Sequence, residues 1–233
     1  MTAEPTAGVH PSATVHSSCV VEGAVAIGAG TVVGPFCHLI GPLVIGADTR
    51  IAAHCVLGSE PEHRRLGGAG TVRIGSGCVL HPLCVVTRGT GARDTRIGDD
   101  VYLMDHVHVS HDAVIGDHAT VSHNAVFAGH TRVHEGATIG MAAITHQHST
   151  VGAYAMLGMG AVVTRDVPPF VLVTGNPARF RRFNTHALER LELDAAALRV
   201  EGGELRSEDE RVAAHLAAFA ADRREGRQVV ALG

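Results

Sequence analysis

The stretch that decides the fold is residues 97–163, IGDDVYLMDHVHVSHDAVIGDHATVSHNAVFAGHTRVHEGATIGMAAITHQHSTVGAYAMLGMGAVV. Every sixth residue from Ile97 to Val163 is apolar, and Thr145 is the single polar member of the series. A period of six fits neither an α-helix nor an alternating strand, but it is typical of hexapeptide β-helix repeats. Three such hexads form one triangular coil.

The same period extends toward the N-terminus, from Val9 to Leu57 and again through Ile74, Leu80 and Val86. Four residues after each apolar position the residue is nearly always small or aliphatic. All five cysteines occupy this second position: Cys19, Cys37, Cys55, Cys78 and Cys84. A free cysteine behaves as a small hydrophobic residue, so we expect these thiols in the core and reduced.

These two periodicities predict an all-β solenoid, a left-handed parallel β-helix of about eight coils with a short C-terminal α-helical extension. Its left hand is expected from its resemblance to known hexapeptide proteins. We expect the β-helix domain to span residues 1–183 and the helical extension residues 184–233. Two polar excursions interrupt the period, at about residues 58–73 and 87–96, and loops expelled from a rigid solenoid often carry function.

The extension is expected to hold two helices, over residues 185–193 and 207–224, the second capped by Ser207. Its apolar stripe should pack on the solenoid or on a neighbouring subunit, and it comprises Val212, Ala213, Leu216, Ala217 and Phe219.

Composition narrows the functional classes. The 233 residues suffice for one continuous core, and the formal net charge is −4. Because all 19 basic residues are arginines without a clustered stripe, and only 3% of residues are aromatic, nucleic-acid binding is disfavoured. We see no signal-peptide pattern and no apolar run of membrane-spanning length, so we expect a cytoplasmic protein without a membrane span.

Histidine is concentrated in the second half of the solenoid. Nine of the 17 histidines lie between His106 and His148, and none occupies an inward position. His111 is the strongest catalytic candidate because Asp112 follows it, and a carboxylate can fix the tautomer of an imidazole that takes up a proton. The cysteines are expected in the core and no well-placed serine accompanies His111. Direct attack by a bound acceptor is therefore favoured over a covalent enzyme intermediate.

Several strings together resemble a known family. HVSHDAVIG (108–116), NAVFAGH (124–130), THQH (145–148), DVPPF (166–170) and the pair Gly175-Asn176 look like the UDP-N-acetylglucosamine O-acyltransferases of lipid A synthesis. The resemblance covers about residues 9–192. It implies acyl transfer from acyl carrier protein, with an acyl-phosphopantetheine thioester as co-substrate and no tightly bound cofactor or metal. It also implies a homotrimer with the site between subunits.

The resemblance carries residue roles with it. His111 would be the general base, Asp112 its support, and the backbone N–H of Gly129 the oxyanion hole. Met159 would limit the length of the acyl chain to short or medium donors. The remaining matched positions would contact the acceptor, the acyl chain or the carrier protein: Arg88, His108, His130, His146, Gln147, Asn184 and Arg190.

The first excursion departs from the family pattern. Where the family usually has P-Q-D-L-K-Y, residues 61–66 read PEHRRL, so His63 and Arg65 replace the acidic and lysine side chains that bind the sugar nucleotide. Thr87 replaces a family histidine. We therefore expect His63 and Arg65 to contact a small-molecule acceptor, which could be a nucleotide sugar, a sugar phosphate or another metabolite.

Three other functions remain open. A coenzyme A-dependent sugar O- or N-acetyltransferase would share the GNPAR tail (175–179). A zinc enzyme resembling γ-type carbonic anhydrases could use His106 and His111, with His54 the candidate third ligand. A catalytically idle scaffold would tolerate the loss of His111.

Overall fold

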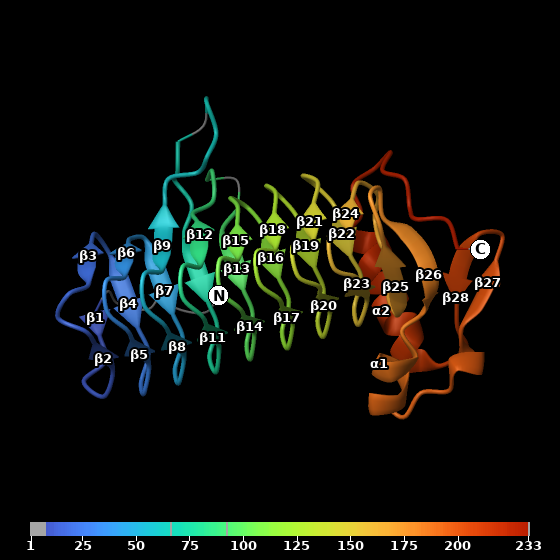
Figure 1. The fold of residues 1–233 in the computed structure, drawn as a ribbon, viewed down its shortest axis with the longest axis horizontal. Helices are drawn as coiled ribbons and strands as arrows, with labels where there is room; N and C mark the ends of the chain where they lie inside the picture. The colour runs from blue at the N-terminus through green and yellow to red at the C-terminus, as the bar shows by residue number, and fades with distance from the viewer. Residues whose placement is uncertain (1–7, 66, 92, 233) are drawn as a thin grey trace.

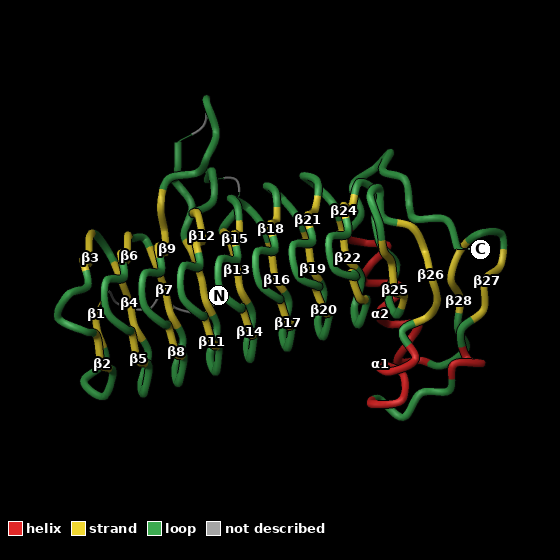
Figure 2. Tube along the Cα trace, in the orientation of Figure 1, coloured by secondary structure: helices red, strands yellow, loops and turns green. Residues whose placement is uncertain are grey.

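The computed structural model of the chain describes residues 8–65, 67–91 and 93–232 (Figure 1). Three parallel sheets run along one left-handed solenoid, and the chain passes from the first sheet to the second, to the third, and back to the first. Figure 2 shows the short strands stacked coil on coil with turns between them. The predicted β-helix and its short C-terminal helices are confirmed.

The first and third sheets have eight strands each, which agrees with the expected number of coils. The first sheet comprises β1 (Gly8–Val9), β4 (Val25–Ile27), β7 (Leu43–Ile45), β10 (Val72–Ile74), β13 (Thr95–Ile97), β16 (Val114–Ile115), β19 (Arg132–Val133) and β22 (Thr150–Val151). The third comprises β3 (Val20–Glu22), β6 (His38–Ile40), β9 (Val56–Ser59), β12 (Val85–Thr87), β15 (His108–Val109), β18 (Val126–Phe127), β21 (Ile144–Thr145) and β24 (Val162–Val163).

The second sheet is extended by the start of the tail. It comprises β2 (Thr14–Val15), β5 (Val32–Val33), β8 (Arg50–Ile51), β11 (Val79–Leu80), β14 (Tyr102–Leu103), β17 (Thr120–Val121), β20 (Thr138–Ile139), β23 (Met156–Leu157), β25 (Val171–Thr174) and β26 (Arg179–Phe183). The last pair, β25 and β26, is antiparallel and ends the coil.

The apolar series forms the core because residues 18 apart stack in register, as Val109 does on Phe127. Members of the series from Ile27 to Val163 are buried. Val9 and Val21 are exposed, since they lie in the first coil at the open end of the stack. The cysteines follow the same logic: Cys37, Cys55, Cys78 and Cys84 are buried, Cys19 is half-buried, and all five are free thiols.

Most turns between sheets place one residue in the left-handed region of backbone space. His106, Asp112, His118 and His130 have φ values of 59°, 59°, 57° and 61°. Histidine, asparagine and aspartate are enriched at such positions among residues other than glycine. Part of the histidine density therefore serves the turns of the solenoid.

The two excursions leave the coil at one edge, where the third sheet passes to the first. β9 ends at Ser59 and β10 starts at Val72, while β12 ends at Thr87 and β13 starts at Thr95. The excursions thus lie within residues 60–71 and 88–94, slightly inside the predicted ranges. The longer one projects from the solenoid after β9 in Figure 1.

The tail holds more structure than predicted. α1 (Thr185–Arg190) and α2 (Glu210–Asp222) are shorter than expected, and between them lie a 3₁₀ turn (Ala195–Ala197) and a hairpin of β27 (Arg199–Glu201) and β28 (Glu204–Arg206). The prediction that Ser207 caps the second helix is wrong: the cap is Asp209, whose carboxylate accepts from the N–H groups of Arg211 and Val212.

The most buried members of the predicted apolar stripe are Val212 and Phe219. Val212 packs in a separate cluster with Phe170 and leucines of the tail, and the Phe219 ring lies edge to face against His134 of the solenoid. α2 contacts β22 of the first sheet. After α2 the chain returns to Asp166, whose buried carboxylate pairs with Arg223 and Arg227. None of the helices in the described part of the chain has the length and apolar character needed to cross a membrane.

Candidate active site

The candidate site lies at the edge where the third sheet turns into the first, which we call the third–first corner. Its turns are residues 110–113, 128–131 and 146–149, on three successive coils. Both excursions also leave from this corner, so the loops and the histidine-bearing turns lie on the same edge. The hexapeptide repeat thus brings together residues that are 18 or more positions apart.

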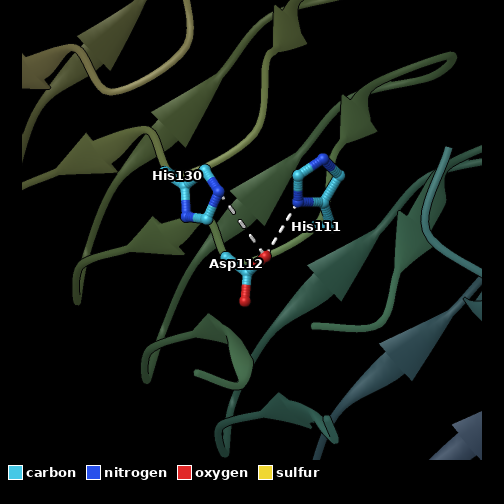
Figure 3. Close-up of side chains that lie close together, drawn as sticks. All are labelled: His111, Asp112 and His130. Carbon is cyan, nitrogen blue, oxygen red and sulfur yellow. Dashed lines mark hydrogen bonds and ion pairs between the residues drawn. The ribbon is translucent and has the colours of Figure 1, made fainter. Parts of the chain in front are cut away.

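His111 and Asp112 form the centre of this corner (Figure 3). Nδ1 of His111 lies 2.8 Å from Oδ2 of Asp112. The imidazole is 11% exposed and the carboxylate is fully buried. An ionised carboxylate only accepts hydrogen bonds, so this contact places the proton on Nδ1, which donates, and leaves the lone pair of Nε2 available.

The carboxylate of Asp112 is held by the second excursion. The Thr90 hydroxyl donates to Oδ2 at 2.9 Å and the Thr90 amide donates to Oδ1 at 3.1 Å. The amide of Asp112 donates to the Thr95 hydroxyl at 2.9 Å. Burial alone would raise the pKa of Asp112, but the hydrogen bonds from His111 and Thr90 outweigh it and the pKa is lowered. Asp112 is therefore a fixed negative charge at neutral pH.

Gly129 lies against the imidazole from the next coil. A Cβ atom built on Gly129 would lie 2.6 Å from Cε1 and 2.8 Å from Nε2 of His111, so the contact requires glycine here. The Gly129 carbonyl accepts from the amide of His148. Its own amide N–H has no acceptor among the described residues, which leaves an unused donor on the residue that packs against the His111 ring.

A row of histidine rings continues from this point. The ring centroids of His111 and His130 are 5.2 Å apart in an edge-to-face arrangement, and those of His130 and His148 are 4.4 Å apart in a stack. Nε2 of His130 lies 3.8 Å from Oδ2 of Asp112. Burial lowers the pKa of both His130 and His148, and Arg224 adds to the effect on both.

The first excursion is held over the corner by contacts of two glutamate side chains. Glu60 pairs with Nη2 of Arg88, whose Nη1 donates to the carbonyl of Gly41 at 3.0 Å. Oε2 of Glu62 lies 3.2 Å from Nε2 of His108. Arg88 and His108 thus hold the loop, and a direct contact of either with substrate stays a prediction.

This loop brings His63 to the site. Its ring centroid lies 5.9 Å from that of His111, edge to face. Arg65 is exposed on the same loop, and its amide donates to Nδ1 of His63. His146 and Gln147 lie in the turn one coil after Gly129 and are also exposed. These four residues border the corner, and their contact with an acceptor stays a prediction.

Three predicted site residues lie away from the corner. Met159 is 78% exposed in the turn after β23, on the edge between the second and third sheets. Asn184 is buried as the cap of α1, and its side-chain amide donates to the carbonyl of Tyr154. Arg190 is exposed at the end of α1. A single subunit therefore does not place them beside His111.

Three side chains in the described part of the chain could bind one metal ion, since ligand atoms of His111, Asp112 and His130 lie within 4.8 Å of one another. The set weighed for zinc is arranged differently. His54 and His106 lie in turns between the second and third sheets, whereas His111 lies at the third–first corner. One subunit does not gather those three ligands.

Sequence reasoning missed the residues that enclose the site. Glu60 and Glu62 anchor the first excursion, and His148 stacks on His130. Thr90 lies two residues after Arg88 and supports Asp112. Thr90 lies in the predicted second excursion and His148 in the motif THQH (145–148), so the sequence pointed to both segments. The partners of Glu60 and Glu62, in contrast, depend on how the loop folds.

Comparison with known proteins indicates the same family as the sequence motifs do. The bacterial transferase hexapeptide model matches residues 24–59 and 94–129, and the model for domain 2 of UDP N-acetylglucosamine O-acyltransferase matches residues 166–200. The acyl-[acyl-carrier-protein]–UDP-N-acetylglucosamine O-acyltransferase of Xanthomonas campestris is 38% identical over 203 residues, which cover 80% of this chain and 77% of that protein. This chain belongs to the UDP-N-acetylglucosamine O-acyltransferase family.

Other relatives agree with this assignment. The Verminephrobacter eiseniae enzyme of the same name is 37% identical over 68% of this chain and 62% of that protein. The structure of LpxA from Acinetobacter baumannii matches with a TM-score of 0.64 at 26% identity, and the match covers 81% of this chain and 79% of that chain. The Francisella novicida UDP-N-acetylglucosamine acyltransferase has a TM-score of 0.81 at 22% identity over 96% and 94% of the two chains, which shows the shared fold.

Proposed function

We propose that the protein transfers an acyl group from acyl carrier protein to a hydroxyl or amine of a sugar-nucleotide-like acceptor, with His111 as general base. The observation that carries the proposal is the contact between His111 and the buried, ionised Asp112. That contact fixes a tautomer whose Nε2 can take a proton. Family membership supplies the reaction class, because the relatives are named for acyl transfer from acyl carrier protein to UDP-N-acetylglucosamine.

The proton moves in two steps. Nε2 of His111 accepts the proton of the acceptor group as its oxygen or nitrogen attacks the thioester carbonyl. The imidazolium so formed is stabilised by Asp112. When the tetrahedral intermediate collapses, the carbon–sulfur bond breaks and the departing thiolate takes the proton back from Nε2. No covalent enzyme intermediate is needed.

Gly129 would stabilise the negative charge of that intermediate. Gly129 lies against the His111 ring, and its amide has no acceptor among the described residues. A preorganised N–H at a developing oxyanion is worth several kcal/mol in a water-poor site. The low exposure of His111 and the loop above it favour such a site.

The proposal includes a homotrimer in the cytoplasm. Met159 and Arg190 cannot join His111 within one subunit, so their predicted roles in chain length and carrier binding require a neighbouring copy to supply them. The exposure of Met159 leaves it available for that contact. Five free thiols suit a reducing compartment. The acyl thioester is a co-substrate, and the proposal requires no tightly bound cofactor.

The test is mass spectrometry of products from a panel of acyl carrier protein thioesters and acyl-coenzyme A, offered against UDP-amino sugars. The proposal expects a product in which the acyl group replaces one hydrogen of the acceptor, with the corresponding mass, formed faster from the carrier protein thioester. Faster transfer from acetyl-coenzyme A would favour the acetyltransferase instead. No acylated product from any pair, together with stoichiometric zinc by elemental analysis, would favour the metalloenzyme.

A further inference from the structure

The end of α2 encloses a cavity of about 350 Å³ beside the candidate active site. Residues from three distant parts of the chain line it, because α2 ends against the third–first corner. The side chains that bear on the argument are Arg93, His130, Arg132, His148, Arg223 and Arg224. The His130 ring contacts His111 and stacks on His148, so the lining of the cavity includes a direct neighbour of His111.

Two of the arginines are held in place by carboxylates. Nη1 of Arg132 donates to Oδ1 of Asp222 at 2.8 Å. Nε of Arg223 donates to Oδ2 of the buried Asp166 at 3.3 Å. Arg132 comes from the first sheet and Arg223 from the end of α2, so these contacts fix both walls of the cavity.

The other two arginines have no such partner. Arg93 lies in the second excursion and Arg224 two residues after α2, and neither side chain forms an ion pair or hydrogen bond with a residue of the described chain. Asp222 is the one carboxylate among the described lining residues, against four guanidinium groups. The lining therefore carries an excess of positive charge with unused N–H donors.

The positive charge in the cavity helps to lower the pKa of the two histidines that line it. Burial is the largest cause of the lowered pKa of His130, and the positive charges of Arg93 and Arg224 act in the same direction, against the opposing charge of Asp112. The lowered pKa of His130 and of His148 favours the neutral ring at neutral pH. They can donate or accept a hydrogen bond there without changing the charge of the site.

We infer that this cavity binds a phosphoryl group of a substrate, held by Arg93 and Arg224 beside the His130–His148 stack. Guanidinium groups match phosphate oxygens in a forked geometry and bind them more strongly than neutral donors do. Two sources share this chemistry under the proposed function, on which this step rests: the diphosphate of a nucleotide-sugar acceptor and the phosphate of the donor's phosphopantetheine arm. Either would be anchored within reach of His111.

The binding itself is tested with inorganic pyrophosphate, titrated calorimetrically into the full-length protein. The inference expects saturable binding that weakens with added salt and weakens at least about tenfold in Arg93→Gln/Arg224→Gln, since the double variant loses two charge-assisted sets of hydrogen bonds to the phosphate. Arg181→Gln is the matched control, an exposed arginine on β26 outside the cavity, and should bind as the wild type does. Equal binding by the double variant, or no saturable binding by the wild type, would overturn the inference.

Kinetics then identify the source of the phosphoryl group. In the double variant a higher KM for the UDP-sugar with an unchanged KM for acyl carrier protein assigns the cavity to the acceptor, and the reverse pattern assigns it to the donor. Both KM values unchanged would contradict the inference. The two proposals fail separately: absence of any acyl transfer by the wild type would refute the proposed function, while the pyrophosphate titration would still decide whether the cavity binds phosphate. His111→Ala should leave pyrophosphate binding intact.

Discussion

Two corners of the solenoid carry nearly the same pair of side chains in different surroundings. At the third–first corner Nδ1 of His111 lies 2.8 Å from Asp112, and at the corner between the second and third sheets Nδ1 of His123 lies 2.9 Å from Asp105. The first pair is 11% and 0% exposed, whereas the second is 39% and 40% exposed. The two pairs have similar contact distances, but they differ in how much of each side chain is exposed to solvent.

The difference comes from the excursions and the turns above each pair. Thr90 donates two hydrogen bonds to Asp112, and the first excursion brings His63 beside His111. Water competes for an exposed ion pair and makes it weak, while a buried, fully bonded carboxylate keeps its charge and orients its partner. The comparison predicts that acyl transfer depends on the enclosed His111–Asp112 pair and not on the exposed His123–Asp105 pair.

Replacing His111 with alanine should have the largest effect. Loss of a general base costs about 10²–10⁴-fold in the rate of the chemical step. His123→Ala is the matched control, and its rate should stay within about twofold because an exposed pair contributes little. The measurement is kcat for acyl transfer in both variants, with melting temperatures to show that both fold. Equal losses in the two variants would remove the distinction between the corners.

Replacing Gly129 with alanine should come next. The new methyl group would meet the His111 ring at 2.6 Å and displace it, and a misplacement near 1 Å costs about 10²-fold in rate. Gly98→Ala introduces a similar clash with Asp117 at a corner without the excursions. That control should lose stability but keep its kcat per folded molecule. A fully active Gly129→Ala would show that the ring position is not critical.

Asp112→Asn should reduce kcat by about 10–10²-fold, as expected when a hydrogen bond to a charged group worth about 1.5–3 kcal/mol is lost. The substitution should also change how the stability of the protein depends on pH. Because the pKa of Asp112 is lowered in the fold, its ionised form stabilises the protein at neutral pH, and that contribution is lost as pH falls through the lowered pKa.

Denaturant unfolding at neutral pH and at about pH 3 measures this dependence. The wild type should be more stable than Asp112→Asn at neutral pH, and the gap should narrow in acid. A gap of the same size at both pH values would mean that the buried carboxylate is not the cause.

The smallest effect is expected for Thr90→Val, which removes one neutral donor from Asp112 and should slow transfer by about 3–10-fold. Thr87→Val is its control, since the Thr87 hydroxyl is buried without a hydrogen-bond partner in the described chain. The control should be near neutral in both stability and kcat. Equal slowing in the two variants would place the effect in packing rather than in support of Asp112.

Local patterns in the sequence were enough to predict the fold and the contact between His111 and Asp112 at the candidate site. The period of six predicts stacked coils, because each inward residue packs on its counterpart 18 residues later, as Val109 does on Phe127. Adjacent residues such as His111 and Asp112 need no knowledge of tertiary structure to be paired. The histidine density was a weaker signal than it looked, since His106, His118 and His130 occupy left-handed turn positions.

The contacts that enclose the site could not be predicted in this way. The pairing of Glu60 with Arg88 depends on how a non-repeating loop folds back across 28 residues. The approach of Arg224 to His130 depends on where α2 ends against the first sheet. Loops and tails escape the repeat, so their partners are set by tertiary packing and not by the period.

The most direct test of the account is the protonation state of His111, measured by ¹⁵N NMR of the imidazole nitrogens at about pH 8, where an ordinary histidine is neutral. The account predicts a proton on Nδ1 and a bare Nε2 for His111, and a mixture of the two tautomers for His111 in Asp112→Asn. A proton on Nε2 of His111 in the wild type would contradict it, because that nitrogen could not then accept the proton of the acceptor.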